Sequence, residues 1–290
     1  MGRRFRLMDK VYGKVLPGCV NRFRGLDVVG DIAVIKVPEE AEPYRFEVAR
    51  ELLKHLPSVR VVLRQVSPTS GLYRVRGLEW LAGERRTTTV HREHGCVFKV
   101  DLAKVYFSPR LLYERLRIAK LVEPGEVVVN MFAGVGCFSI VIAKLKPVSK
   151  VYSIDVNPEA YRFMVENIRL NKVEQVVEPI LGDSKTVVES RLRGVADRVL
   201  MPLPELAYEY LPSAVTCLKP VGGWIHYYDF VKAGKGEDPE AKAVQKVSGR
   251  LLGLNRPWSI AYSRVVRTVA ARTYQVVLDI RIGAHGDMKS

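Results

Sequence analysis

The chain has 290 residues, 48% of them hydrophobic and 27% charged, so it can form one large or two smaller cores and is too apolar for a disordered protein. Its longest charge-free apolar run, residues 127–143, is shorter than the ~20 residues of a membrane span and contains Asn130, which argues against a membrane protein. The net charge is +15, and residues 1–125 carry most of the excess, so we expect a polyanionic partner such as a nucleic acid.

The chain has four cysteines, at positions 19, 96, 137 and 217. None forms a C-x-x-C pair, so neither a zinc ribbon nor a disulfide framework is predicted. His91, His94 and Cys96 resemble a ligand group only faintly, and we expect no metal. The first ten residues lack the apolar segment of a secretory signal, which favours a cytoplasmic protein.

Residues 1–122 are expected to form a smaller basic α+β domain, with the first ~20 residues as a basic extension. The predicted elements are strands at 26–29 and 32–37, a helix at 42–56, strands at 59–66 and 96–100, and a helix at 110–121. Gly30 and Asp31 supply the turn between the first two strands. The turn residues Glu123, Pro124 and Gly125 mark the domain boundary.

Residues 123–290 are expected to form an α/β domain. The predicted elements are strands at 126–131, 151–154, 176–181, 198–201 and 223–230, with helices ending at 146 and spanning 158–172 and 205–218. This alternation predicts a mostly parallel sheet with helices on both faces. Two further strands at 258–266 and 273–282 should form an antiparallel hairpin at its end. Such a sheet is typical of a large class of nucleoside-binding proteins.

A glycine-bearing turn follows the first strand of this domain, with Gly134 and Gly136 leading into a helix. Two glycines there allow a ligand to approach the backbone and the free N–H groups of the helix. Asp155 ends the next strand, where a carboxylate can accept both ribose hydroxyls, and Asp183 ends the third. Each acid alone is more often a helix cap or turn residue. The third glycine of a dinucleotide fingerprint is missing, which disfavours a nicotinamide oxidoreductase.

The motifs F-A-G-V-G-x-F, I-D-x-N-P and G-D resemble those of Rossmann-like class I methyltransferases that use S-adenosylmethionine. Further motifs carry the likeness across residues 22–285: GLYRVR at 71–76, LAGE at 81–84, TVH at 89–91, YFSPR at 106–110, ER at 114–115, DRVLM at 197–201, LP at 203–204 and WIHYY at 224–228. Together they resemble the archaeal and eukaryotic tRNA (guanine-37, N1) methyltransferases and their relatives in wyosine synthesis.

The resemblance implies a function and a set of site residues. The cofactor would be S-adenosylmethionine, held by Tyr106, Asn130, Phe132, Gly134, Gly136, Phe138, Asp155, Asn157 and Asp183. The substrate would be the anticodon loop of tRNA, contacted at position 37 by Arg74, Arg110, Arg115, Pro202 and Pro204. Glu114 would be the general base that removes the N1 proton, and Arg74 would stabilise the charge that develops on O6. We expect a monomer.

Each of the two catalytic candidates also has an ordinary structural explanation. Glu114 could form an ordinary helix ion pair with Arg110, Arg115 or Arg117. Arg74 could be a solvated charge at a strand edge.

The chain departs from the family pattern at three positions. Asn130 stands where an aspartate is usual, and Cys137 stands where proline is common. Pro202 replaces the asparagine of Asn-Leu-Pro, and proline offers no side-chain polar group or backbone N–H to a base edge. An archaeal branch that methylates C7 of 4-demethylwyosine resembles this pattern. The target is therefore expected to be N1 of guanosine, C7 of 4-demethylwyosine, or both.

Many relatives carry an extra N-terminal domain that grips the tRNA elbow. Here the family-like region begins after ~20 residues, so we expect binding to depend mainly on the anticodon arm. Two alternatives remain open: transfer of the aminocarboxypropyl group to the same wyosine precursor, and a non-catalytic tRNA-binding protein.

Overall fold

The computed structural model describes residues 2–17, 25–68, 71–254 and 256–284. For residues 2–7 it describes the backbone only. Cys19 therefore lies outside the described residues. The chain divides into two compact units, Met1–Leu112 and Tyr113–Ser290. This division falls ten residues before the boundary that we placed after residue 122. The reason is that the helix Leu112–Leu121 bonds through Glu114 and Arg117 to strands of the second unit.

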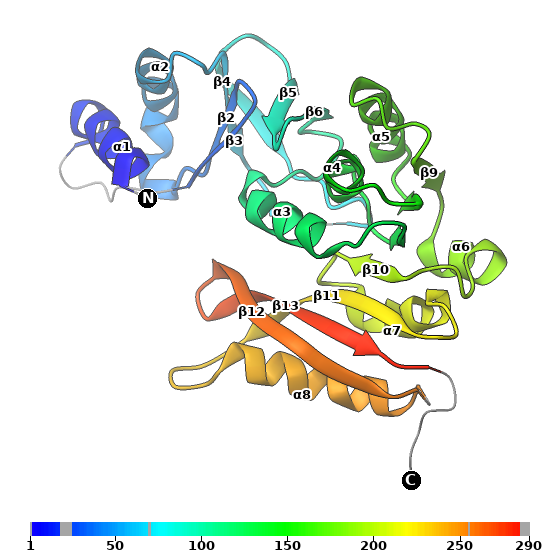
Figure 1. The fold of residues 1–290 in the computed structure, drawn as a ribbon. Coiled ribbons are helices and arrows are strands. Elements are labelled where there is room, and N and C mark those ends of the chain that lie inside the picture. The colour runs from blue at the N-terminus through cyan, green and yellow to red at the C-terminus, as the bar shows by residue number, and fades with distance from the viewer. Residues whose placement is uncertain (1, 18–24, 69–70, 255, 285–290) are drawn as a thin grey trace. The chain divides into compact units, whose positions relative to one another are not determined.

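Unit 1 contains a four-stranded sheet with the order β1-β2-β3-β4 and a separate β5-β6 hairpin. Its elements are α1 (Gly2–Val15), β1 (Leu26–Val29), β2 (Ile32–Ile35), η1 (Glu39–Tyr44), α2 (Arg45–His55), β3 (Val61–Gln65), β4 (Leu78–Gly83), β5 (Thr88–Glu93), β6 (Cys96–Asp101) and η2 (Pro109–Leu111). β2 and β3 are parallel, and the other neighbouring pairs in both sheets are antiparallel. The α+β class predicted for this segment is confirmed (Figure 1).

Helix α1 occupies most of the segment that we expected to be only a basic extension. Its Val11 and Tyr12 are almost fully buried against a core that includes Val48 and Leu52 of α2. Each fully buried side chain of this size contributes ~1.5–3 kcal/mol, so this segment is part of the fold of unit 1. The periodic signal was overlooked because six of the first fourteen residues are Arg, Lys or Asp.

Gly30 makes the turn that the sequence predicted between β1 and β2. Its φ is +54°, and a Cβ there would lie 2.3 Å from Thr89 Oγ1 and 2.4 Å from the carbonyl oxygen of Val90. Any side chain would therefore clash with β5. The turn matches the prediction, and the two strands pair antiparallel with Val29 opposite Ile32.

Two of the predicted helices become α-helical later than expected, each after a 3₁₀ turn that contains a proline. Pro43 lies inside the 3₁₀ turn η1, and the α-helix α2 begins only at Arg45. Pro109 likewise opens η2, and α3 (Leu112–Leu121) follows it. Each of these prolines lies in a 3₁₀ turn that directly precedes the α-helix.

Unit 2 is built on a seven-stranded sheet with the order β12-β13-β11-β10-β7-β8-β9. The strands are β7 (Val127–Asn130), β8 (Lys150–Asp155), β9 (Val177–Leu181), β10 (Arg198–Met201), β11 (Gly223–Lys232), β12 (Trp258–Ala270) and β13 (Thr273–Ile282). β11, β10, β7, β8 and β9 run parallel, whereas β13 is antiparallel to β11 and to β12. The predicted Rossmann-like sheet with its terminal hairpin is confirmed.

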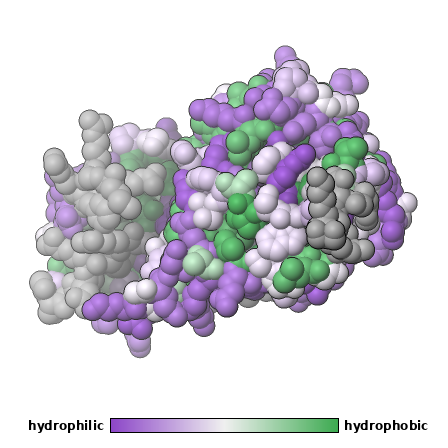
Figure 2. Space-filling view, turned by 60° about the horizontal axis from the view of Figure 1, so that its bottom comes forward, coloured by the Kyte–Doolittle hydropathy of each residue, from purple (hydrophilic) through white to green (hydrophobic). Residues whose placement is uncertain are grey.

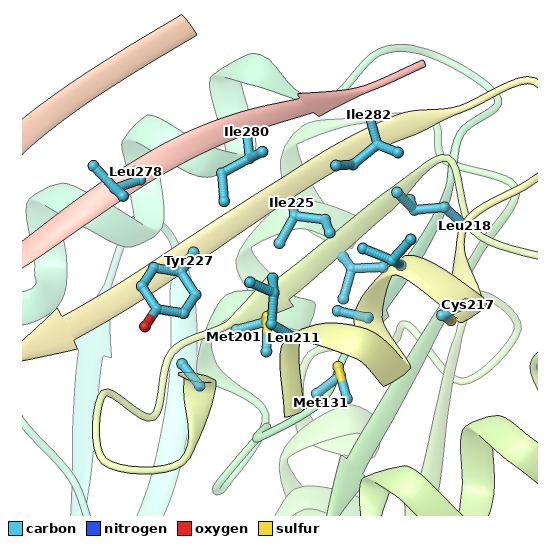
Figure 3. Packing of buried hydrophobic residues seen from close by; sticks show 14 of the residues in the cluster. Met131, Met201, Leu211, Cys217, Leu218, Ile225, Tyr227, Leu278, Ile280 and Ile282 are labelled. Atoms are coloured by element: carbon cyan, nitrogen blue, oxygen red, sulfur yellow. The ribbon is translucent and has the colours of Figure 1, made fainter. Parts of the chain in front are cut away.

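Helices cover both faces of this sheet. Besides α3 they are α4 (Cys137–Leu145), α5 (Pro158–Leu170), α6 (Ser184–Arg191), α7 (Ala207–Cys217) and α8 (Pro239–Leu252), of which the sequence reading missed α6 and α8. α7 and α8 lie along the same side of the sheet (Figure 1). Their apolar side chains pack with Met201, Ile225, Tyr227 and Leu278 in one hydrophobic core of the unit (Figure 3).

Strand alternation places polar side chains on the opposite face of the same strands. Tyr227 faces the apolar core, so its neighbours His226 and Tyr228 point away from it, toward α3. The second face of the sheet therefore carries the chemistry of the unit.

Hydrophilic residues cover most of the described surface on the face shown in Figure 2, with small separate hydrophobic patches. None of the helices in the described part of the chain combines the length and the apolar character that a bilayer span requires.

Candidate functional site

The glycine-bearing loop after β7 lies where the sheet reverses its order, between β7 and β10. Open α/β sheets bind ligands at such a switch point, beyond the carboxyl ends of the strands. Gly134 and Gly136 have φ of +56° and +90°, and Gly136 is the N-cap of α4. A Cβ on Gly136 would lie 3.1 Å from Ile140 Cδ1 and 3.2 Å from Met164 Cγ. The loop thus needs glycine both for its backbone angles and for its packing.

Asp155, the last residue of β8, turns its carboxylate toward this loop. Its Oδ2 accepts a hydrogen bond from the Gly134 N–H at 2.7 Å, and its Oδ1 accepts one from the Asn157 N–H at 2.9 Å. Burial raises the pKa of Asp155. The backbone hydrogen bonds act in the opposite direction but do not outweigh the effect of burial. Each carboxylate oxygen keeps acceptor capacity for a ribose hydroxyl.

Two other predicted cofactor residues are helix caps. Asn157 is the N-cap of α5 and accepts the Glu159 N–H at 3.0 Å. Asp183 is the N-cap of α6, accepts the Thr186 N–H at 3.1 Å, and also accepts the Tyr210 hydroxyl. Burial opposes ionisation of Asp183, but these donors lower its pKa overall. The capping alternative therefore applies to Asp183, whereas Asp155 caps no helix.

The loops after β7, β8 and β9 are joined by backbone contacts. The Ala133 N–H donates to the Ile154 carbonyl at 2.8 Å, and the Gly182 N–H donates to the Asp155 carbonyl at 3.0 Å. The Ser184 hydroxyl donates to the Met131 carbonyl. Asp155 and Asp183 are therefore held at one edge of the sheet, as the sequence led us to expect.

Asn130 and the two phenylalanines of the loop motif are held by internal contacts. Asn130 is fully buried; its Nδ2 donates to Ser139 Oγ at 3.2 Å, and its Oδ1 accepts the Phe132 N–H at 3.4 Å. The Phe132 ring packs edge-to-face on Tyr210, with centroids 5.2 Å apart. Because Asn130 is fully buried, contact with a cofactor would require its amide to become exposed.

Glu114 is buried on α3, with 1% of its surface exposed, and three donors surround its carboxylate. Arg264 of β12 pairs with Oε1, while Arg117 Nε and the Tyr228 hydroxyl donate to Oε2 at 3.1 and 3.0 Å. The helix ion pair with Arg117 that we considered as an alternative is present. Two guanidinium groups stabilise Glu114 as the anion, the form that a proton acceptor must have.

Arg117 connects Glu114 to a chain of buried polar groups. Its guanidinium binds both oxygens of Asp279, at 2.6 and 3.2 Å, and Asp279 Oδ1 is 2.6 Å from His226 Nδ1. His226 Nε2 is 2.7 Å from Arg198 Nη1, and Arg198 also binds both oxygens of Glu126. We call Glu114, Arg117, Asp279, His226, Arg198 and Glu126 the buried polar chain.

The hydrogen bonds determine the protonation of His226. A guanidinium can only donate, so Nε2 must accept from Arg198, and Nδ1 must carry the hydrogen that Asp279 accepts. The ring is therefore neutral. Complete burial lowers the pKa of His226, although the Asp279 carboxylate acts in the opposite direction. Burial acts to raise the pKa of Asp279, but its contacts with His226 and Arg117 outweigh this effect and lower the pKa to about 2.

Tyr228 links this chain to the cofactor loop. Its hydroxyl contacts Glu114, and its ring lies edge-to-face on Phe138 of α4, with centroids 6.2 Å apart. Within unit 2, the predicted base and the predicted cofactor loop are thus connected through one aromatic pair.

Three predicted residues belong to unit 1. Arg74 lies in a turn with φ of +54°, its N–H donating to the Gly71 carbonyl at 3.2 Å. Arg110 pairs with Asp27, Nε to Oδ1 at 2.7 Å, and its side chain is half exposed. Tyr106 is exposed.

The remaining predicted substrate residues lie in unit 2. Arg115 is almost fully buried, so contact with RNA would require its side chain to become exposed. Pro202 follows the last residue of β10 and is partly exposed, whereas Pro204 is buried.

No group of three potential metal ligands occurs among the residues that the structure describes. The two histidines that resembled a ligand group in the sequence have other partners in unit 1. His94 Nε2 is 2.9 Å from the Leu112 carbonyl, and the His91 ring packs against Phe107.

Comparison with known proteins identifies the family. Residues 89–248 match the model of the TRM5/TYW2 methyltransferase domain, and residues 19–87 match that of the TYW2 N-terminal domain. The chain belongs to the TRM5/TYW2 methyltransferase family. The resemblance that the sequence motifs carried is confirmed, and so is the enzyme class.

Relatives within the TRM5/TYW2 family carry two kinds of name. The tRNA (guanine(37)-N(1))-methyltransferase Trm5b of Pyrococcus abyssi is 42% identical over 88% of this chain and 74% of its own length. The tRNA 4-demethylwyosine(37)-methyltransferase Taw21 of Saccharolobus solfataricus is 41% identical over 89% of this chain and 94% of its own.

Solved structures agree with this assignment. The crystal structure of P. abyssi Trm5b has a TM-score of 0.80 at 40% identity, covering 94% of this chain and 78% of that one. P. horikoshii TYW2 in complex with MeSAdo has a TM-score of 0.77 at 29% identity, covering 97% and 99%. The complex of aTrm5 with tRNALeu has a TM-score of 0.79 at 37% identity, covering 97% and 78%.

Sequence reasoning missed most of the groups that surround Glu114. Tyr228, Asp279 and Arg264 were not assigned to the site. Two signals could have found them: strand alternation places His226 and Tyr228 on one face, and Asp279 is an isolated acid within the apolar strand β13.

Proposed function

We propose that this protein transfers the methyl group of S-adenosylmethionine to the purine-derived base at position 37 of tRNA. The observation that carries the proposal is the placement of Asp155 and the glycine loop at the switch point, joined through Phe138 and Tyr228 to Glu114. The residues present fit the cofactor, because the glycine loop with positive φ at Gly134 and Gly136 leads into the N-terminus of α4 and Asp155 keeps acceptor capacity for a ribose. When bound, S-adenosylmethionine supplies an electrophilic methyl sulfonium.

The residues of this chain bind and orient the reactants and move one proton. Asp155 holds the ribose, and Asp183 and Tyr106 contact the nucleoside. Glu114 accepts the N1 proton of guanosine, and Arg74 stabilises the negative charge that develops on O6. Arg110 binds the RNA that carries the target base. The protein acts on the anticodon loop, as a monomer in the cytoplasm.

The target is N1 of guanosine, C7 of 4-demethylwyosine, or both. Pro202 supports the second target, because it offers no polar side chain to a guanine edge at the end of β10. A relative named for 4-demethylwyosine methylation is 41% identical to this chain. The test is incubation with one tRNA that bears guanosine and one that bears 4-demethylwyosine, followed by nucleoside mass spectrometry.

The Pro202→Asn variant belongs in the same experiment. An asparagine restores a donor and an acceptor, so we expect the preference to move toward guanosine. An unchanged ratio of the two products would discredit the role of Pro202.

One specific observation favours a second candidate, transfer of the aminocarboxypropyl group to the same precursor. Residues 19–87 match the TYW2 N-terminal domain, and a Methanocaldococcus jannaschii aminocarboxypropyltransferase is 37% identical over 70% of this chain. Mass spectrometry separates the two adducts directly.

A further inference from the structure

Two exposed tyrosines flank Glu114 on the surface of unit 2. Tyr113, the residue before Glu114 on α3, is 60% exposed, and Tyr262 of the edge strand β12 is 39% exposed. Large aromatic side chains usually bury most of their surface, so two such rings beside one buried carboxylate require an explanation.

Guanidinium groups hold both tyrosine rings in place. Arg264 lies over the Tyr113 ring, 4.5 Å from its centroid, and Arg117 lies over the Tyr262 ring at 5.0 Å. Both guanidinium groups also bind the Glu114 carboxylate. The tyrosines are therefore fixed relative to Glu114 by two independent cation–π contacts.

Arg264 is incompletely satisfied in this arrangement. Its Nη2 pairs with Glu114, but its Nε is buried and has no hydrogen-bond partner among the described residues. This Nε is closed to solvent, so an incoming phosphate would contact the exposed part of the Arg264 side chain, which is 30% exposed.

The segment that contains β12 is rich in positive charge, although the Glu240 carboxylate accepts from Ser263 and Val265 of this strand. From residue 241 to residue 278 the sequence has seven Lys or Arg residues and no Asp or Glu. β12, which lies in this segment, is the last strand of the sheet, so one of its edges has no neighbouring strand. Fixed aromatic rings within a positive field suit single-stranded RNA, whose bases stack and whose phosphates are anionic.

We propose that Tyr113, Tyr262 and Arg264 form a stacking platform for an unpaired RNA nucleotide adjoining the base that reacts at Glu114. The proposal rests on the proposed function, because it uses Glu114 to locate the reacting base. A neighbouring base stacks on a tyrosine ring, and the backbone phosphate approaches Arg264. The platform thus holds the loop open while the target base is out of its stack.

The test measures binding of a fluorescently labelled anticodon-arm hairpin by anisotropy, with no methyl transfer required. Tyr113→Ala and Tyr262→Ala should each raise the Kd by about 5- to 100-fold, whereas Tyr113→Phe and Tyr262→Phe, which keep the ring, should stay within about twofold of the wild type. The slope of log Kd against log salt concentration should not change, because stacking releases no counterions. Leu252→Ala, at an exposed position on α8, is the remote control.

Affinities of both alanine variants equal to that of the wild type would overturn the platform, and so would phenylalanine variants as weak as the alanine ones. Far-ultraviolet circular dichroism and S-adenosylhomocysteine affinity check that the variants fold. The proposed function fails separately, if wild-type protein methylates neither tRNA. Weaker hairpin binding by the alanine variants would support the platform even then.

Discussion

Replacement of Asp279 by asparagine should disrupt the buried polar chain while preserving the shape of the side chain. Asp279 is the shared acceptor of Arg117 and His226, and its side chain is 6% exposed. An asparagine can accept from one of these partners but presents its NH₂ group to the other. The buried polar chain then holds two positive and two negative charges, and Arg117 keeps Glu114 as its only carboxylate partner.

The magnitude follows from two considerations. The pKa of Asp279 falls from 3.8 to about 2 on folding, so ionised Asp279 contributes about 2 kcal/mol relative to its protonated form. Protonated aspartate resembles asparagine in charge and shape, so we take this value as the lower bound for the loss of stability in Asp279→Asn. Removing one member of a buried ion pair costs about 3–5 kcal/mol, which is the upper bound. We therefore expect Asp279→Asn to lower the free energy of unfolding by about 2–5 kcal/mol at pH 7.

The pH dependence provides the assay. A carboxyl whose pKa is depressed by folding stabilises the protein above its unfolded pKa, and this contribution is lost as the pH falls through the folded pKa. Urea unfolding of the wild type and of Asp279→Asn should therefore differ by a constant amount above about pH 5, and the difference should shrink between about pH 4 and pH 2. A difference below about 1 kcal/mol at pH 7, or one that does not change with pH, would refute the reasoning.

A control variant separates loss of stability from loss of the site. Asp229→Asn removes a different buried carboxylate, which lies on β11. Asp229 pairs with Lys246 at 2.7 Å and is outside the buried polar chain. We expect both variants to be less stable, but only Asp279→Asn to reduce methyl transfer under conditions where both are folded.

Three further predictions concern the cofactor loop and Glu114. Asp155→Asn should raise the Kd for S-adenosylhomocysteine about 10- to 100-fold in isothermal titration, because a charged acceptor of hydrogen bonds is lost; an unchanged Kd would exclude the ribose contact. Gly136→Ala should cost about 1–2 kcal/mol in urea unfolding, because its φ is +90°, whereas Gly249→Ala in α8, where a Cβ meets nothing within 4 Å, should not destabilise. Glu114→Gln should slow N1 methylation of guanosine about 10²- to 10⁴-fold with little change in cofactor affinity; wild-type turnover would remove Glu114 as the base.

The sequence was informative where local chemistry decides the structure. The glycine turn, the strand that ends at Asp155 and the alternation of strands with helices all follow from short-range preferences, and the structure confirms them. The position of β13 between β11 and β12 agrees with the predicted hairpin.

The contacts of Glu114 could not be found in this way. Its partners Arg264 and Tyr228 are 150 and 114 residues away in the sequence, and the pairing register of β11, β12 and β13 brings them to α3. Helix α8 was missed because its amphipathic pattern lies among charged residues, while the short helix α6 has a weak apolar pattern and begins at the same Asp183 that we had assigned to a ligand.

The order of strands in unit 2 has a consequence for how the polypeptide acquires activity. β13 is the last strand in the sequence but lies between β11 and β12, so β12 can join the sheet only after β13 has been synthesised. Arg264, which pairs with the buried carboxylate of Glu114, and Asp279, which binds Arg117 beside it, both belong to this final hairpin. The surroundings of Glu114 can therefore be completed only after the final hairpin of the chain has been synthesised.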